Sequence, residues 1–128
     1  MKFLLDTHLL LWAAEDVGRV PKAAREFMAD AGNELHYSVV SLWEVAIKQR
    51  LSREDFRHDA RVLRRGLRDN RYHELPVSGD HAVAVAGLQS LHRDPFDRLL
   101  IAQATVEGIM LMTCDPQIAQ YPGPILKL

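Results

Sequence analysis

The fold of this chain is decided by residues 94–115, which read DPFDRLLIAQATVEGIMLMTCD. Pro95 suits the first turn of a helix, because its missing N–H is one that a helix start leaves unpaired. The apolar residues that follow carry this helix to Glu107, and residues 109–113 then form a mainly apolar strand. A helix that leads into a buried strand is the unit from which parallel sheets are built.

Short apolar runs and amphipathic stretches alternate through the rest of the chain. We expect further strands at residues 2–5, 35–39, 72–77 and 125–128. Helices are expected at residues 7–14, from Pro21 to Gly32, from Ser41 onward, and at 57–69 and 78–88. Because parallel crossovers need a helix-length connection, the pattern predicts an α/β fold with a mainly parallel sheet covered on both sides. The 128 residues suit one compact domain over residues 1–128.

The composition excludes several classes of protein. The net charge is -1, from 16 Lys and Arg against 17 Asp and Glu, so any binding of nucleic acid must come from local patches. Cys114 is the only cysteine, which excludes an intramolecular disulfide, and the six histidines show no zinc spacing. No apolar run approaches the roughly 18 residues of a membrane span, and the first apolar stretch is too short for a signal peptide. We therefore expect a cytoplasmic protein that does not bind the membrane.

Two further functional classes are disfavoured. The chain has no glycine-rich phosphate loop and no Ser-His-Asp arrangement, which argues against an NTPase and a nicotinamide enzyme. A receiver-type signalling domain needs an acidic pair after its first strand and an aspartate after its third. Here only Asp6 follows the first strand, the next suitable aspartate is Asp80 at a helix start, and Lys127 stands almost at the end.

Acidic residues occur where the expected strands lead into helices. Asp6 follows the first strand, Glu44 lies one turn into the helix after the second, and Asp115 follows the strand at 109–113. Asp94 and Asp97 stand at the start of the helix that contains Pro95. Because the carboxyl ends of parallel strands meet at one edge of a sheet, these acids are predicted to lie near one another.

Two interpretations of these acids stay open at this point. Each acid can simply cap a helix, and Ser41 with Glu44 matches a capping box. Carboxylates that converge on one cleft, however, repel one another and raise one another's pKa unless a cation is present. Oxygen ligands of this kind suit Mg²⁺ or Mn²⁺, and such a site can activate water for attack on a phosphodiester.

Four motifs, in order along the whole chain, resemble those of PIN domains. The first two are LLDTH at residues 4–8 and SVVSLWE at residues 38–44. Residues 92–104, HRDPFDRLLIAQA, closely resemble the third motif of the VapC-type toxins and are the most specific of the four. MTCD at residues 112–115 matches the last strand and its acid.

The resemblance implies a three-layer α/β/α sandwich with a five-stranded parallel sheet. It also implies a divalent-metal-dependent endoribonuclease that uses Mg²⁺, or alternatively Mn²⁺. Such a protein is the toxin of a toxin–antitoxin pair, usually forms a homodimer, and is inhibited by a small antitoxin protein. An alternative is a PIN fold without catalysis that binds RNA or protein.

The family's site residues carry over by position. Asp6 and Asp97 correspond to the main metal ligands, and Glu44 binds the metal directly or through water, or positions the attacking water. Asp115 completes the pocket. Asp97 is preferred over Asp94 for the third position because the apolar residues after it follow the family's spacing, which leaves Asp94 as a helix cap that adds negative potential. His92 and Arg93 are interpreted as loop residues.

Several other side chains have a functional and a structural interpretation. Thr7 and Thr113 are candidates to orient the acids through their hydroxyl groups, whereas His8 is interpreted as a packed neighbour. Trp12 and Trp43 are interpreted as core or dimer residues rather than base-stacking residues. Cys114 is expected to be buried and inert.

Five arginines recur at helical spacing after residue 56. In the functional interpretation they form a basic rim that binds RNA phosphates or the acidic residues of an antitoxin. In the structural interpretation they form a solvated helix face whose charge nearby acids balance. The five are Arg57, Arg61, Arg64, Arg65 and Arg68.

Overall fold

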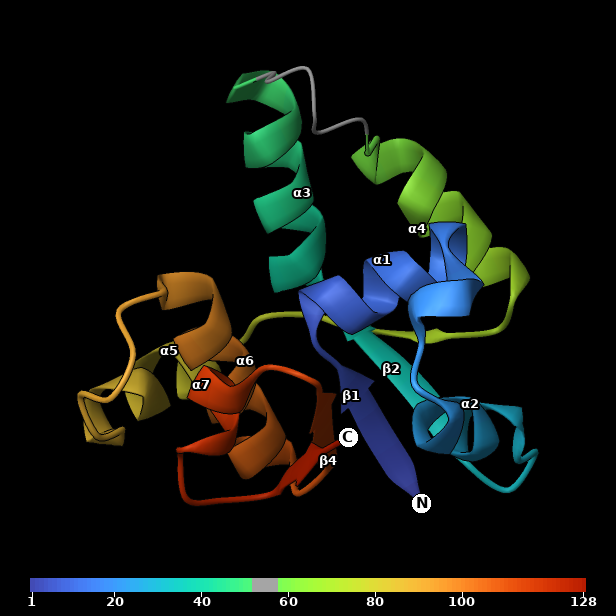
Figure 1. Ribbon diagram of the computed structural model, residues 1–128. Coiled ribbons are helices and arrows are strands. Elements are labelled where there is room, and N and C mark those ends of the chain that lie inside the picture. The colour runs from blue at the N-terminus through green and yellow to red at the C-terminus, as the bar shows by residue number, and fades with distance from the viewer. Residues whose placement is uncertain (52–57) are drawn as a thin grey trace.

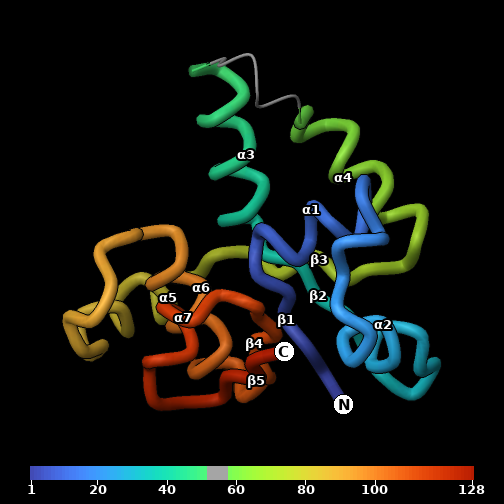
Figure 2. The backbone as a smooth tube through the Cα atoms, in the orientation of Figure 1, coloured from blue at the N-terminus to red at the C-terminus, as the bar shows by residue number. Residues whose placement is uncertain are grey.

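The computed structural model describes residues 1–51 and 58–128 and contains one parallel sheet (Figure 1). All strand pairs are parallel, and the order is β3-β2-β1-β4-β5, as Figure 2 also shows. The five strands are β1 (Lys2–Leu5), β2 (Glu34–Ser38), β3 (His73–Leu75), β4 (Met110–Thr113) and β5 (Ile125–Lys127). The expected strands are confirmed, although the third is shorter than predicted.

Helices connect the strands as the alternating pattern predicted. Two short 3₁₀ turns, η1 (Val17–Arg19) and η2 (Val85–Gly87), extend α1 and α5, and α7 was not expected from the sequence. The helices are α1 (Thr7–Glu15), α2 (Lys22–Ala29), α3 (Val39–Leu51), α4 (Ala60–Asp69), α5 (Gly79–Ala84), α6 (Pro95–Glu107) and α7 (Pro116–Ala119). Among these described helices, none is both long and apolar enough to cross a membrane.

The helices form two layers, one on each face of the sheet, because successive strand residues point to opposite faces. Phe3 and Leu5 of β1 belong to a buried cluster with residues of α1, α2 and α4. Leu4, between them, belongs to a second cluster with residues of α6 and α7. Figure 1 shows these two sets of helices on opposite sides of the sheet. The predicted α/β/α arrangement is therefore confirmed.

The strand order creates a reversal beside the central strand. From β1 the chain builds outward through β2 to β3, and it then returns to place β4 on the other side of β1. The helix after β1 packs into the first cluster, whereas Ile118 in the helix after β4 packs into the second. Open α/β sheets bind their ligands at the carboxyl ends of strands beside such a reversal. The carboxyl ends of β1 and β4 are therefore the predicted location of a ligand-binding site.

The core depends on side chains of the central strand. Leu4 is fully buried between the sheet and α6, so Leu4→Ala leaves a cavity as well as reducing apolar burial. We expect a loss of about 2–5 kcal/mol in the free energy of unfolding, measured by denaturant titration with circular dichroism. Val62→Ala is the matched control, because Val62 is exposed and its truncation is expected to cost less than about 0.5 kcal/mol. Equal destabilisation of the two variants would contradict this account of the core.

Candidate active site

Asp6 is buried at the end of β1 and makes three connections. Its Oδ1 accepts a hydrogen bond from the backbone N–H of Leu9 at 2.8 Å, which caps α1. Its Oδ2 accepts a hydrogen bond from the hydroxyl of Thr113 at the end of β4. Its own N–H donates to the carbonyl of Met112 at 3.1 Å. Asp6 is therefore both a helix cap and a link between the ends of β1 and β4.

Asp115 lies beside Asp6 at this reversal. Its backbone N–H donates to Thr113 Oγ1 at 3.0 Å, and its Oδ1 accepts from the N–H of Gln117 at 2.8 Å. Burial raises the pKa of Asp6 and the charge of Asp115 raises it further, whereas the hydrogen bonds from Thr113 and Leu9 lower it. Thr113 Oγ1 thus bonds the carboxylate of Asp6 and the backbone N–H of Asp115, but not the Asp115 carboxylate.

The helix that carries Glu44 begins earlier than the sequence predicted. Ser38 Oγ accepts from the N–H of Val40 at 3.0 Å, and α3 starts at Val39. Ser41 is therefore inside the helix, so the predicted capping box between Ser41 and Glu44 is wrong. The Ser41 hydroxyl instead shares a hydrogen bond of 2.8 Å with the hydroxyl of Thr7. The expectation that Thr7 bonds an acid is corrected too, since its hydroxyl ties α1 to α3.

Glu44 is a buried carboxylate with one oxygen unsatisfied. Only 3% of its side chain is exposed, and Oε2 accepts a hydrogen bond from Lys48 Nζ at 2.7 Å. Within residues 1–51 and 58–128, Oε1 has no hydrogen-bond partner. Leaving a charged oxygen buried and unpaired costs more than the roughly 1–3 kcal/mol of a neutral group. Helix capping does not explain this acid, and Lys48 satisfies only one of its two oxygens, so Oε1 is available to a further cation.

Asp97 faces Glu44 from the first turn of α6. Burial raises the pKa of Asp97 to about 6, with the charges of Asp94 and Glu44 adding to the effect. Asp94 caps the helix, because its Oδ1 accepts from the N–H groups of Phe96 at 2.9 Å and Asp97 at 3.2 Å. The assignment of Asp94 as the cap is confirmed, and its charge does add to the negative potential at Asp97.

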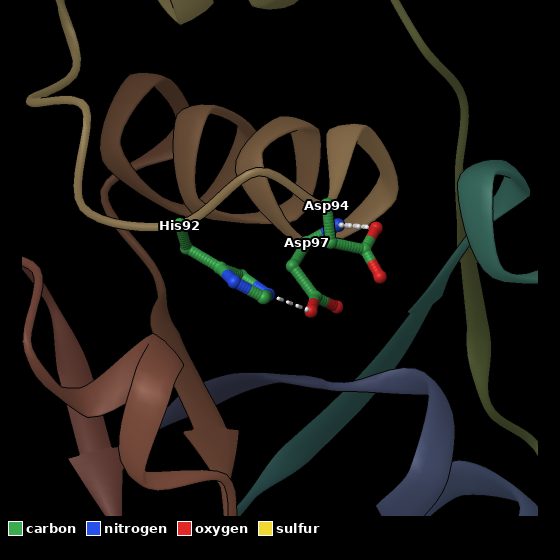
Figure 3. Close-up of side chains that lie close together, drawn as sticks. All are labelled: His92, Asp94 and Asp97. Carbon is green, nitrogen blue, oxygen red and sulfur yellow. Dashed lines mark hydrogen bonds and ion pairs between the residues drawn. The ribbon is translucent and has the colours of Figure 1, made fainter.

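His92 is a site residue that the sequence interpretation missed. Its Nε2 lies 2.9 Å from Asp97 Oδ2, and Figure 3 shows the two side chains pointing toward one another. Its backbone N–H donates to the hydroxyl of Tyr121 at 2.8 Å, and that hydroxyl also accepts from Arg98 at 3.0 Å. The bond between His92 and Tyr121 spans 29 residues of sequence, so no local pattern could have revealed it. Ligand atoms of His92, Asp94 and Asp97 lie within 4.8 Å of one another.

The structure places the predicted acids in two groups, and among the described residues only His92, Asp94 and Asp97 bring three ligand atoms within 4.8 Å of one another. Asp6 and Asp115 interact across the ends of β1 and β4, and Glu44 and Asp97 interact across α3 and α6. The hydrogen bond between Thr7 and Ser41 connects the helix that Asp6 caps to the helix that carries Glu44. The donor set is mostly carboxylate oxygen, which is the chemistry of a site for Mg²⁺ or Mn²⁺.

A hollow of about 420 Å³ adjoins Glu44 between α1 and α3. Glu44, Lys48 and Thr7 line it together with His8 and Trp12. His8 is exposed, and its charge lowers the pKa of Asp6, so it is an electrostatic neighbour of the site. Trp12 packs against the first core cluster as expected.

The arginines of α4 fall into two kinds. Arg64 makes a two-pronged ion pair with Glu74, from Nε at 2.7 Å and Nη2 at 3.0 Å, and Glu74 also accepts from the hydroxyl of Tyr37. Arg64 therefore stabilises the contact between α4 and β3, as the structural interpretation of the arginines predicted. Three others lie on the exposed face of α4 around a hollow of about 310 Å³, and the fifth, Arg57, lies outside the described residues. The three are Arg61, Arg65 and Arg68.

Cys114 and Trp43 differ in burial from what the sequence predicted. Cys114 is half-buried, and burial together with the charge of Asp6 raises the pKa of its thiol, as an inert cysteine requires. Of the two predicted roles for Trp43, packing in the core is wrong, because 57% of Trp43 is exposed, and packing in a dimer stays a prediction. Its neighbours Val40, Glu44 and Val45 form the buried stripe of α3, and residue 43 lies off that stripe.

The fold and the site define a class, namely an α/β protein with carboxylates gathered at the carboxyl ends of a parallel sheet. The family model of the PIN domain matches residues 3–124, so the chain belongs to the PIN domain family. The comparison with curated protein sequences gives no match.

Solved structures share this fold over nearly the full length. VapBC2 from Rickettsia felis, bound to a DNA fragment from its promoter, has a TM-score of 0.72 at 17% identity, covering 100% of this chain and 99% of that chain. DNA-bound VapBC from Salmonella typhimurium has a TM-score of 0.65 at 18% identity, with 99% and 98% covered. VapBC-5 from Mycobacterium tuberculosis has a TM-score of 0.59 at 19% identity, with 99% and 97% covered.

The raised pKa of Asp97 makes stability depend on pH. Between its ordinary value of 3.8 and about 6, the folded chain holds a proton that the unfolded chain has released. The free energy of unfolding of the metal-free protein is therefore expected to fall, by on the order of 2 kcal/mol, as pH rises through this window. Urea titrations in EDTA across the window measure it. The Asp97→Asn variant should show a flatter dependence, and an identical dependence in both proteins would contradict the assignment.

Proposed function

We propose that this chain is a divalent-metal-dependent endoribonuclease and the toxin of a toxin–antitoxin pair. The observation that carries the proposal is Glu44, whose buried Oε1 has no hydrogen-bond partner within the described residues while its charge acts on Asp97. A buried and a half-buried carboxylate that repel one another raise the free energy of the protein unless positive charge compensates both, and Lys48 contacts only Oε2 of Glu44. In a metal-dependent hydrolase the divalent metal ion supplies this positive charge and also takes part in the reaction.

The donor set fits Mg²⁺, with Mn²⁺ as the alternative. Asp6, Glu44 and Asp97 would hold the ion, and Asp115 would complete the pocket beside Asp6. A bound divalent ion supplies the positive charge that activates water and stabilises the developing charge on a phosphodiester. Because the carboxyl groups of Asp6 and Asp97 have raised pKa values, loading the site releases protons, and metal affinity should rise with pH.

The surrounding residues hold these acids in fixed orientations. Thr113 and the start of α1 fix the two oxygens of Asp6, so its carboxylate cannot rotate freely. His92 fixes one oxygen of Asp97 from a loop that Tyr121 anchors. Lys48 brings a positive charge to Glu44 while 44% of its side chain stays exposed, so it can also contact a substrate phosphate.

The partners in this proposal come from the resemblance and from the similar structures. The similar structures are complexes of the VapBC kind, which supports a cognate antitoxin protein as a partner here. RNA as the substrate, a homodimer and a cytoplasmic location complete the proposal. A non-catalytic PIN-fold module that binds RNA or protein is the alternative, but such a module would not need Oε1 of Glu44 to stay buried without a partner.

Substitution of the acids tests the proposed chemistry. Asp6→Asn, Glu44→Gln and Asp97→Asn each remove a charge that the ion requires, so we expect cleavage of a structured RNA panel to fall by at least about 100-fold. Cleavage is measured with purified, antitoxin-free protein in Mg²⁺, in Mn²⁺ and in EDTA. Isothermal titration with Mn²⁺ should show weaker binding in the same variants.

Asp80→Asn is the matched control, because Asp80 is an exposed acid in the first turn of α5. It should leave both cleavage and metal binding unchanged. Cleavage that survives EDTA, or that survives the three substitutions, would exclude the proposed mechanism. Metal binding without cleavage of any RNA would favour the non-catalytic module.

The exposed arginines of α4 give a separate prediction about RNA binding. If Arg61 and Arg65 neutralise phosphates, the double variant Arg61→Gln and Arg65→Gln should make the plot of log affinity against log salt shallower, by about 0.7 in slope for each arginine that binds a phosphate. Arg64 is left intact because its ion pair with Glu74 supports the fold. Fluorescence anisotropy across a salt series measures the slope, and an unchanged slope would show that this face is only solvated.

A further inference from the structure

Trp43 is a large aromatic side chain that lies outside both core clusters. It lies on α3 with 57% of its surface exposed, although tryptophan is the residue that gains most from burial. The buried residues of this helix stand at other positions, so the packing of the core does not require Trp43. Isolated exposed apolar residues are common, and exposure alone therefore assigns no role.

The position of Trp43 gives it a role. It directly precedes Glu44, and its ring packs against Phe96, which directly precedes Asp97. The two ring centroids are 5.1 Å apart and the rings are inclined at 74°, which is the edge-to-face geometry of a stable aromatic pair. The pair joins α3 to α6 next to the two acids that interact across them. We call this pair the aromatic rim; Phe96 is half-buried, Trp43 is exposed, and each adjoins one of the two acids in the sequence.

The charge of the site restricts what this rim can bind. The chain has a net charge of -1, and carboxylates lie next to the rim, so phosphate groups are repelled there unless metal is bound. An indole ring cannot neutralise a phosphate, but it offers a flat apolar face to a nucleobase. Stacking of this kind needs a base whose face is free, which duplex RNA does not provide.

We propose that Trp43, braced by Phe96, stacks on an unpaired nucleobase of the RNA beside the scissile phosphate. The inference rests on the proposed function and deepens it, because it assigns a residue that positions the RNA beside the acids. It is an alternative to the sequence-based interpretation of Trp43 as a dimer residue. Stacking fixes the chain of the RNA next to Glu44 and Asp97 without adding positive charge.

Binding of short RNA measures this role without requiring cleavage. The probe is a fluorescein-labelled RNA decamer without self-pairing, titrated with wild-type protein in Ca²⁺, with the same sequence as a duplex for comparison. Trp43→Ala should weaken binding of the single strand by about 5- to 100-fold, the range for removal of one stacked base, while duplex binding stays unchanged. Trp43→Phe should restore most of the affinity. The slope of affinity against salt should be the same in all three proteins, because stacking releases no counterions.

Leu51→Ala is the matched control, since Leu51 is an apolar residue of the same helix with 71% exposure at the opposite end from Trp43. It should bind like the wild type. Equal affinity of wild type and Trp43→Ala for the single strand would overturn the stacking proposal alone. Weaker binding together with a change in oligomeric state by light scattering would assign Trp43 to an interface between copies instead. Failure of the wild type to bind either RNA would contradict the proposed function itself.

Discussion

The structure depends on the hydrogen bond from Thr113 to Asp6, which joins the ends of β4 and β1. These strands are adjacent only because the chain reverses its direction across the sheet after β3. The reversal sends the following helices to opposite faces and leaves their starting residues side by side at the carboxyl edge. A buried aspartate there is stable because a hydroxyl and a helix N-terminus satisfy its two oxygens. The same bonds hold it in the orientation that a ligand to an ion needs.

The bonds to Asp6 stabilise the site, whereas the repulsion between Glu44 and Asp97 destabilises it. Glu44 and Asp97 are brought together across α3 and α6, where burial and mutual repulsion favour the protonated form of Asp97. Lys48 and His92 offset this by one hydrogen bond each, yet one oxygen of Glu44 stays unpaired within the described residues. A fold optimised for stability alone would not retain this arrangement, since local strain of this kind collects at functional sites.

Much of this arrangement could be predicted from local signals. Pro95, the apolar periodicity after it and the strand at 109–113 predicted α6 and β4, and the alternation along the chain predicted the parallel sheet. Asp6 and Asp94 were predicted both as caps and as acids of the site, and each is a cap in the structure. The predictions were wrong where a residue distant in the sequence determines the contact of a side chain. Ser41 bonds Thr7 instead of capping its helix, and Trp43 pairs with Phe96 instead of entering the core.

The sequence by itself determined the elements, their parallel arrangement and the identity of the acids, because capping, helical periodicity and strand patterning act over a few residues. Tertiary structure alone decided which acids meet, since the pairing of Asp97 with Glu44 needs α3 and α6 in contact. It also decided that His92 reaches Asp97, because Tyr121 anchors the backbone of His92 from 29 residues away. Electrostatic repulsion, desolvation and ring packing all depend on distance in space, and the order of residues along the chain does not specify that distance.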